Sequence, residues 1–247
     1  MKNSGNTILI TGGSSGFGRE YARRWHDAGN TVIVVARSED GLIETVEGRD
    51  NLHYLTVDVA DKDDVVRMAA EAIERFPEIN VVMNNAGIMP FEDLTGERDL
   101  ADAEKVVAIN FLGPIRITDA FIEHLKKADD AVLINVSSGL GFVPLPKAPT
   151  YSATKAALHS YTLTLRKKLD GMVEVIELVP PGVQTELTPG QSERDGYMPL
   201  DDFIDETMAL FEQNPTPTEI CVEQVKPFRN AAADGKVTEF IDMLAKR

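Results

Sequence analysis

The sequence predicts an α/β fold in which helices cover both faces of a parallel sheet. β-Branched apolar runs alternate with amphipathic stretches, which is typical of strands joined by right-handed helical crossovers. The run Val32-Ile33-Val34-Val35 is apolar throughout, as expected for a strand that is buried on both faces. At 247 residues, the chain has a length common for a single domain of this class.

The expected elements follow one another along the chain. We expect six strands, at residues 7–11, 31–35, 52–57, 80–83, 131–136 and 173–179. The main helices between them are expected at residues 18–28, 62–76, 102–127 and 151–169. Because residues 218–232 and 235–245 both have helical patterns, six parallel strands are favoured and seven remain the alternative. Residues 1–247 then form a single, Rossmann-like, doubly wound domain.

The composition argues against several classes of protein. With a net charge of −15, the chain is a poor partner for nucleic acid, which is bound mainly through Lys and Arg. It has no run near the roughly 18 apolar residues of a membrane span. The single cysteine, Cys221, excludes an internal disulfide, and the first residues lack a signal pattern, so we expect a cytoplasmic protein. The four histidines have no metal-ligand spacing, and no metal is expected.

A glycine-rich turn lies between the first strand and the first helix. Glycines let the backbone approach a pyrophosphate closely, and the helix amino end presents unpaired N–H groups to the anion. The position between a strand and a helix makes a dinucleotide site the favoured interpretation over a turn that binds nothing. The residues expected to contact the cofactor here are Gly12, Ser14, Ser15, Gly16, Phe17 and Gly18.

The end of the second strand favours NADP over NAD. An NAD site usually has an acidic residue there to bind the ribose hydroxyls, whereas this chain continues with Ala36-Arg37-Ser38. A guanidinium can bind a 2′-phosphate in bidentate fashion, which a carboxylate would repel. Two alternatives stay open: Glu39 or Asp40 could restore a ribose ligand, or Arg37 could be an ordinary surface residue.

Further cofactor contacts are expected where other strands end. Asp58 could reach the adenine amino group, or it could instead cap the helix that begins near Lys62. The sequence Asn84-Asn85-Ala86-Gly87 combines amides that tie strand ends together with small residues that let a cofactor lie against the backbone. A hydroxyl after the sixth strand could hold the nicotinamide amide. The set is Asp58, Val59, Asn85, Ala86, Gly87, Pro181, Gly182, Val183 and Thr185.

Tyr151 and Lys155 lie four residues apart and therefore on one face of a helix. A tyrosine titrates near pH 10, but a nearby cation stabilises its phenolate, and each unit by which the pKa falls corresponds to about 1.4 kcal/mol. The pair alone is weak evidence because the spacing arises by chance in many helices. Ser138, at the end of the fifth strand, strengthens the interpretation of Tyr151 and Lys155 as a catalytic pair. The Ser138 hydroxyl can polarise a carbonyl that Tyr151 holds.

As an ordered set, these motifs resemble the short-chain dehydrogenase/reductase family from about Thr7 to Thr185. The resemblance implies that Tyr151 is the general acid and base, that Ser138 orients the substrate and that Lys155 also binds the nicotinamide ribose. It further implies that Asn110 supports a water-linked proton relay, although by itself Asn110 has the pattern of a buried helix asparagine. The segments 136–140 and 156–160 also resemble the bacterial DltE-like branch of the family.

The expected function is interconversion of a carbonyl and an alcohol by hydride transfer with NADP. An epimerase or lyase that uses hydride transiently, and a non-enzymatic NADP sensor or scaffold, are the alternatives. A small, hydrophobic substrate is expected, because the candidate pocket residues are largely apolar. Half of them could instead pack in the core of the protein. The candidates are Met89, Phe91, Leu140, Phe142, Val143, Leu187, Tyr197 and Phe203. Residues 182–217 are expected to form a substrate loop with a lid helix.

A homodimer is expected through the long helices at residues 102–127 and 151–169. The family often forms tetramers through its last strand, which this sequence does not clearly contain. The tetramer therefore stays an open alternative.

Overall fold

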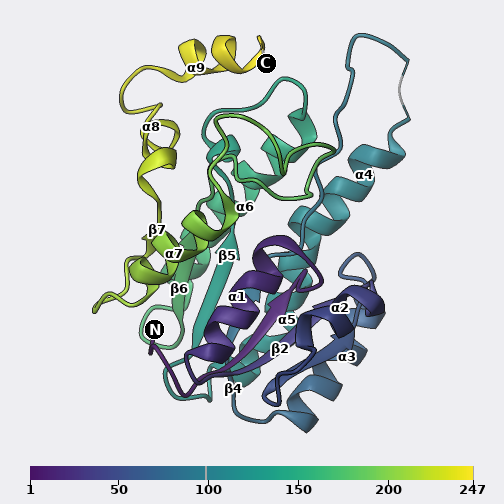
Figure 1. The fold of residues 1–247 in the computed structure, drawn as a ribbon, viewed down its shortest axis with the longest axis vertical. Coiled ribbons are helices and arrows are strands. Elements are labelled where there is room, and N and C mark those ends of the chain that lie inside the picture. The colour runs from purple at the N-terminus through teal and green to yellow at the C-terminus, as the bar shows by residue number, and fades with distance from the viewer. Residues whose placement is uncertain (98, 247) are drawn as a thin grey trace.

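The computed structural model describes residues 1–97 and 99–246, and in this part of the chain seven parallel strands form one sheet (Figure 1). Their order is β3-β2-β1-β4-β5-β6-β7, which is the expected doubly wound arrangement. The strands are β1 Thr7–Thr11, β2 Thr31–Ala36, β3 Leu52–Thr56, β4 Ile79–Asn84, β5 Val132–Val136, β6 Glu174–Leu178 and β7 Glu219–Ile220.

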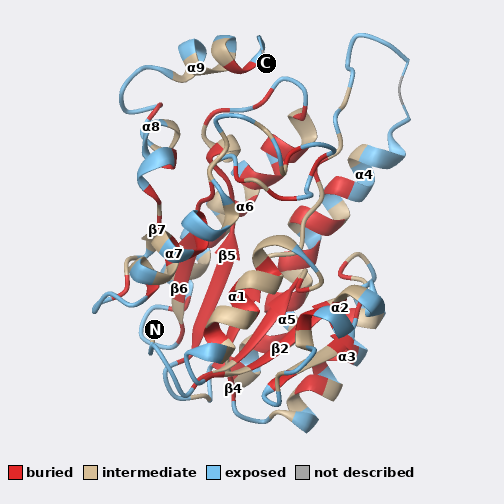
Figure 2. Ribbon diagram, viewed as in Figure 1, coloured by how far each residue is buried: buried red, intermediate tan, exposed pale blue. Residues whose placement is uncertain are grey.

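Each strand sends successive side chains to opposite faces of the sheet. In β1, Ile8 and Ile10 join one apolar cluster and Leu9 joins the other. All three are fully buried, and Figure 2 shows the strands as the most buried part of the molecule. This explains why the strand sequences are apolar throughout rather than alternating.

Helices cover both faces. Helices α1 Gly16–Asp27, α2 Glu39–Val46 and α7 Leu200–Phe211 supply the first apolar cluster, whereas α3 Lys62–Arg75, α5 Gly113–Leu125 and α6 Pro149–Lys168 supply the second. The remaining elements are α4 Ala101–Val107, η1 Ala108–Leu112, η2 Gly139–Gly141, η3 Glu223–Val225, α8 Lys226–Arg229 and α9 Val237–Leu244.

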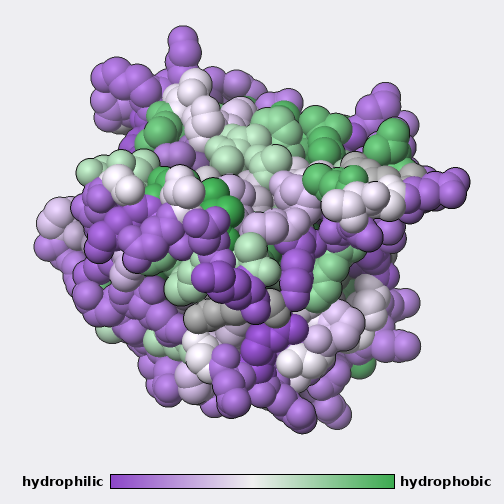
Figure 3. Space-filling view, turned by 90° about the horizontal axis from the view of Figure 1, so that it is seen from above, coloured by the Kyte–Doolittle hydropathy of each residue, from purple (hydrophilic) through white to green (hydrophobic). Residues whose placement is uncertain are grey.

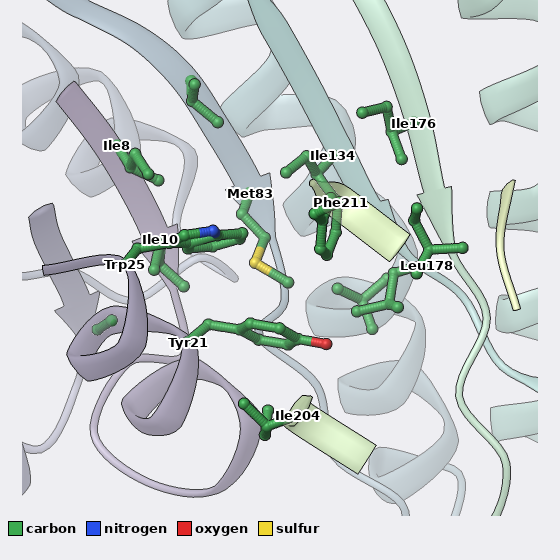
Figure 4. Packing of buried hydrophobic residues seen from close by; sticks show 14 of the residues in the cluster. Ile8, Ile10, Tyr21, Trp25, Met83, Ile134, Ile176, Leu178, Ile204 and Phe211 are labelled. Atoms are coloured by element: carbon green, nitrogen blue, oxygen red, sulfur yellow. The ribbon is translucent and has the colours of Figure 1, made fainter. Parts of the chain in front are cut away.

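An aromatic cluster joins α1 to α7 over the first face of the sheet (Figure 4). The rings of Tyr21 and Trp25 stack with 5.1 Å between centroids, and Phe211 meets Trp25 edge-on at 5.5 Å. The Tyr21 hydroxyl and the Thr207 hydroxyl lie 2.5 Å apart and share a hydrogen bond. The α7 helix is therefore held in the core by both apolar and polar contacts.

The structure corrects two expectations, one about the last part of the chain and one about the long helix. A seventh strand, β7, forms within residues 218–232, because the Glu177 N–H donates to the Thr218 carbonyl and the Val179 N–H to that of Ile220. The helix expected inside residues 182–217 forms as α7, and its buried residues join the first apolar cluster, while its role as a lid stays a prediction. The helix expected at 102–127 divides into α4, the π-helical turn η1 and α5.

Within the described residues, no helix has both the length and the apolar composition needed to cross a membrane.

Candidate active site

A cleft of about 400 Å³ lies along the carboxyl ends of the strands. Its walls come from the β1–α1 turn, the ends of β2 to β5 and the segment after β6. Open α/β sheets bind ligands at the carboxyl ends of their parallel strands, at the point where the strand order reverses. Seen from above, from the end where α9 lies in Figure 1, hydrophobic side chains gather in a patch surrounded by hydrophilic ones (Figure 3).

Three glycines of the turn, Gly12, Gly13 and Gly18, leave no room for a side chain. Gly12 has a φ of +71°, and a Cβ there would lie 2.8 Å from the Ala86 Cα. A Cβ on Gly18 would lie 2.3 Å from the Gly12 carbonyl oxygen. The turn is fixed to β2 because the Gly12 N–H donates to the Val35 carbonyl at 2.8 Å. Glycine is thus needed for the backbone of β1 and α1 to pack this closely against the end of β4.

The amino end of α1 is available to an anion. Ser15 is the N-cap residue, but its side chain accepts no capping hydrogen bond, and the first turn contains no acidic residue. The N–H groups there carry the positive end of the helix dipole. This geometry fits a pyrophosphate, as the sequence predicted.

Arg37 lies at the edge of the cleft with an exposed side chain. The alternative ribose ligand, Glu39, is turned away, since its carboxylate accepts a hydrogen bond from the Tyr54 hydroxyl at 3.3 Å. Neither Glu39 nor Asp40 lines the cleft. The cleft therefore offers a guanidinium rather than a carboxylate at the end of β2.

Asp58 and Asn85 hold other parts of the cleft wall. Asp58 lines the cleft and accepts from the Ala60 N–H, whereas Asp61, not Asp58, caps α3. The Asn85 amide donates to the Thr11 carbonyl at 2.9 Å and to the Gly12 carbonyl at 3.3 Å. It ties the end of β4 to the end of β1, which is the strand-tying role expected of these amides.

Asn110 lies behind the cleft in the π-helical turn and is fully buried. Its side chain accepts from the Ile88 N–H and donates to the Ile88 carbonyl, so the backbone satisfies it. A Cβ on Gly87 would lie 3.5 Å from the Asn110 Oδ1 and 3.8 Å from the Lys155 Nζ. Asn110 and Lys155 thus flank the same glycine, and π-helical turns of this kind are frequent at functional sites.

Ser138, Tyr151 and Lys155 come together at the inner end of the cleft. All three are buried, with exposed fractions of 6%, 7% and 4%. The Ser138 hydroxyl is hydrogen-bonded to the Tyr151 phenol, and the Lys155 Nζ lies 5.6 Å from the centre of the Tyr151 ring. Lys155 also donates to the Val136 carbonyl at 2.7 Å, which fixes the ammonium beside β5.

The protonation of this group differs from the sequence expectation. Burial raises the pKa of Tyr151 to about 12, against the lowering effect of the Ser138 hydrogen bond. Burial lowers the pKa of Lys155 to about 8, opposed by the negative charge of Glu177. The Tyr151 pKa is therefore raised and not lowered as the sequence predicted, because a phenolate in this site loses its hydration. At neutral pH Tyr151 carries its proton and Lys155 its positive charge.

Apolar residues from three parts of the chain pack in one cluster with Tyr151. Met89 follows β4, Val143 and Leu145 follow η2, and Leu244 lies on α9. Phe228 and Phe240 pack against the same cluster, with 5.2 Å between their ring centres. The chain's own carboxyl-terminal helices thus form one wall beside Tyr151.

The segment after β6 forms another part of the cleft wall. The Met198 N–H donates to the Gly182 carbonyl, and the Gln184 N–H donates to the Met198 carbonyl, both at 2.9 Å. The Tyr197 ring lies across Gly182, where a Cβ would be 3.0 Å from it. The predicted substrate loop is therefore tied down on itself next to the end of β6.

Most of the predicted site residues line the one cleft. Gly18, Asn110 and Gly182 lie outside its lining, although Gly18 and Gly182 support it from behind. Among the predicted pocket residues, Met89, Leu140 and Val143 join the cluster around Tyr151. Phe203 does not, because it is fully buried in the core at 4.7 Å from the Phe17 ring. Phe91 is also outside this cluster, and its side chain is 47% exposed.

Sequence reasoning missed Gln191, which lines the cleft and is 4% exposed. Its amide donates to the Val183 carbonyl at 2.8 Å and to the Thr185 hydroxyl at 3.1 Å. It thereby fixes Thr185, the hydroxyl that the sequence predicted for the nicotinamide amide. A polar residue in a loop without periodicity gives no signal that could have identified it.

A second polar cluster lies beside the site. The fully buried Glu177 accepts from His159 at 2.8 Å, and Glu219 accepts two hydrogen bonds from Arg229. The ligand atoms of His159, Glu177 and Glu219 lie within 4.8 Å of one another. Sequence spacing could not reveal this grouping because the three residues come from α6, β6 and β7. The expectation that no metal binds stays a prediction.

Comparisons with known proteins are consistent with this geometry. A family model described as short chain dehydrogenase matches residues 6–196. An uncharacterized oxidoreductase DltE from Bacillus subtilis is 42% identical over 198 residues, which cover 79% of each chain. Sulfoacetaldehyde reductase 2 from Chromohalobacter salexigens is 34% identical over 186 residues, covering 73% of this chain and 74% of that protein.

A solved structure is also similar. The alcohol dehydrogenase from Thermococcus sibiricus, complexed with 5-hydroxy-NADP, superimposes with a TM-score of 0.75 and 26% identity. The match covers 88% of this chain and 94% of that one. The similarity to DltE supports the branch that the sequence resembled.

Proposed function

The chain belongs to the short-chain dehydrogenase family, and from that premise we propose that it is an NADP-dependent reductase of a ketone or aldehyde. The observation that carries this proposal is the convergence of Ser138, Tyr151 and Lys155 at the inner end of a cleft whose other end is the glycine turn. An oxidoreductase of this family needs both parts, one for the nicotinamide dinucleotide and one for the proton.

The described residues fit NADP. The closely packed glycine turn and the uncapped amino end of α1 would hold the pyrophosphate. Arg37 would bind the 2′-phosphate, while Asp58 and Val59 would lie beside the adenine and Thr185 beside the nicotinamide amide. When bound, NADPH supplies the hydride that reduces the carbonyl carbon. NAD is the less favoured cofactor because no carboxylate lines the cleft at the end of β2.

Tyr151 would donate the proton that the carbonyl oxygen takes up. Its raised pKa, about 12, keeps it protonated at neutral pH, which is the form required for reduction. Ser138 would hold the same oxygen by a hydrogen bond and stabilise the charge that develops on it. The Lys155 ammonium would then stabilise the phenolate that remains on Tyr151.

The substrate is proposed to be a small molecule with an apolar body. Met89, Val143 and Leu145 form an apolar wall beside Tyr151, and α8 and α9 add Phe228 and Phe240. Burial of these surfaces against a substrate would be favourable in proportion to its apolar area.

A homodimer is also proposed. Val107 and Leu112, at the ends of α4 and η1, and Leu163 on α6 are exposed apolar residues on the helices that the sequence singled out. Phe111 and Tyr161 make an edge-on ring contact between the same segments. The cytoplasmic location expected from the sequence stays a prediction.

The test is NADPH oxidation with a panel of ketones and aldehydes, followed by measurement of both the oxidised cofactor and the alcohol. We expect one mole of oxidised cofactor for each mole of alcohol. An isomerised or cleaved product without net oxidation of the cofactor would support the epimerase or lyase alternative. Cofactor binding without turnover of any carbonyl would support the sensor alternative.

A further inference from the structure

Arg37 and Arg194 differ from the other described arginines because neither forms an ion pair with a described carboxylate or a hydrogen bond from its guanidinium to a described backbone carbonyl. All but four of the arginines that the structure describes form an ion pair with a carboxylate. Arg116 and Arg166 instead donate to backbone carbonyls. The other two are Arg37 and Arg194. In a chain with 40 acidic and 25 basic residues, a guanidinium without a carboxylate partner is unexpected.

Arg194 has only a phenol as its polar side-chain partner among the described residues. Its guanidinium carbon lies 5.2 Å from the centre of the Tyr197 ring, and its Nη1 donates to the Tyr197 hydroxyl at 3.3 Å. The neighbouring Glu193 and Asp195 are exposed and form no ion pair with it in the described structure. A phenol leaves the positive charge of the half-buried Arg194 uncompensated.

The backbone holds this arginine in place. The Tyr197 N–H donates to the Arg194 carbonyl at 3.2 Å, and the Gln184 amide donates to the same carbonyl at 3.4 Å. The Arg194 N–H donates to the carbonyl of Gln191, whose side chain lines the cofactor cleft. The Arg194 turn is therefore connected to the cofactor cleft through Gln191.

Tyr197 places the guanidinium near the reacting group. Its ring lies across Gly182, directly after the end of β6. Its hydroxyl is close enough to Tyr151 that a negative charge on it would raise the Tyr151 pKa. The Tyr197 hydroxyl, which accepts a hydrogen bond from Arg194, is thus within electrostatic reach of the Tyr151 phenol.

We propose that Arg194 and Tyr197 form a subsite for a single anionic group, a carboxylate or a sulfonate, carried by the carbonyl substrate. The inference rests on the proposed function and extends it to the class of substrate. A planar guanidinium can bind either group through two parallel hydrogen bonds, and the Tyr197 hydroxyl can add a third. With a net charge of −15, the molecule as a whole repels anions, so an anionic substrate requires a local cation.

The apolar wall and the guanidinium together define the substrate. The carbonyl lies at Tyr151, the apolar body lies against Met89 and Val143, and the anionic group lies at Arg194. Arg37 and Arg194 then have equivalent roles, since each binds an anion at its own end of the site.

The experiment compares two pairs of ketones that differ only in charge. One pair is 4-acetylbenzoate and 4-acetylbenzamide, and the other is 4-oxopentanoate and 4-oxopentanamide. A third arm replaces the carboxylate by a sulfonate in 4-acetylbenzenesulfonate. For each compound, kcat/KM is measured with NADPH in the wild type, in Arg194→Gln, in Arg194→Lys and in Arg75→Gln. Arg75, on α3 and paired with Glu71, is the control that removes one positive charge far from the site.

The wild type is expected to prefer the anion in at least one pair by about tenfold or more. Arg194→Gln should lower kcat/KM for the anion by about 10- to 100-fold, mainly through KM, and change that of the amide by less than about threefold. Arg194→Lys should keep part of the preference, and Arg75→Gln all of it. The ratio of benzoate to sulfonate then tells which anion the subsite prefers.

Two failures are distinguishable. Equal use of acid and amide by the wild type, or an unchanged ratio in Arg194→Gln, overturns the anionic subsite but leaves the reductase intact. No NADPH oxidation with any of the five ketones, while NADPH still binds by fluorescence titration, overturns the proposed reductase and the subsite with it.

Discussion

The two ends of the site are built in different ways. At the proposed cofactor end, a short turn between adjacent elements supplies the glycines, and backbone N–H groups would supply the polar contacts. At the substrate end, Tyr151 is surrounded by residues as distant in sequence as Met89 and Leu244. The cofactor end depends on local backbone geometry, whereas the substrate end depends on how distant segments pack.

This difference has a consequence for variants. A change at the cofactor end should alter the use of every carbonyl substrate equally, since all of them need the same hydride donor. A change at the substrate end should discriminate between substrates. Ser138, Tyr151 and Lys155 lie where the two ends meet and should affect the chemical step itself.

After the loss of the Tyr151 hydroxyl, the largest of these effects is expected for Ser138→Ala. Loss of the hydroxyl removes a hydrogen bond to the carbonyl oxygen, and kcat should fall by about 10²- to 10³-fold with every substrate. Steady-state kinetics with NADPH and two unrelated ketones measures this. Ser160→Ala, on the exposed side of α6, is the matched control and should retain full activity. A loss confined to one ketone would mean that Ser138 belongs to the substrate end alone.

A smaller effect is expected for Arg37→Gln. The variant loses a charge-assisted contact with the 2′-phosphate, so the dissociation constant for NADPH should rise by about 10- to 100-fold. The constant for NADH, which lacks that phosphate, should not change. Fluorescence titration measures both. Arg24→Gln, which removes an exposed charge paired with Asp205, serves as the control. Equal weakening of NADH and NADPH would contradict the role of Arg37.

The smallest expected effect is the dependence of reduction on pH. Because burial lowers the pKa of Lys155 to about 8, its positive charge is present below that pH and is lost above it. We expect kcat/KM for reduction to be constant near neutrality and to fall by about tenfold per pH unit above 8. Lys155→Arg, which keeps its charge, should shift the decline to higher pH. A rate that rises through pH 8 would show that a deprotonated group is needed instead.

The same contrast explains what the sequence could predict. The glycine turn, Arg37 and the Tyr151–Lys155 pair lie within short segments that local spacing singles out, and all of them line the cleft. Phe203 was expected in the pocket because its segment is apolar, but an apolar helix face can pack on either a core or a pocket. Only the tertiary contact with Phe17 decides between them.

Other features could not be read from spacing at all. The strand β7 is two residues long and forms because β6 offers an unpaired edge. Arg194 is one of several arginines in the sequence, and that no carboxylate of the described residues pairs with it appears only in three dimensions. The pKa of Tyr151 was expected to be lowered by Lys155 four residues along the helix, but burial raises it.

The central claim is that Tyr151 donates the proton in carbonyl reduction. The most direct test is Tyr151→Phe, which removes the hydroxyl and keeps the ring, with the single-turnover rate of NADPH oxidation measured at saturating ketone. We expect the rate to fall by about 10²- to 10⁴-fold while the dissociation constant for NADPH stays unchanged. If the variant binds NADPH normally and retains most of the wild-type rate, Tyr151 is not the proton donor.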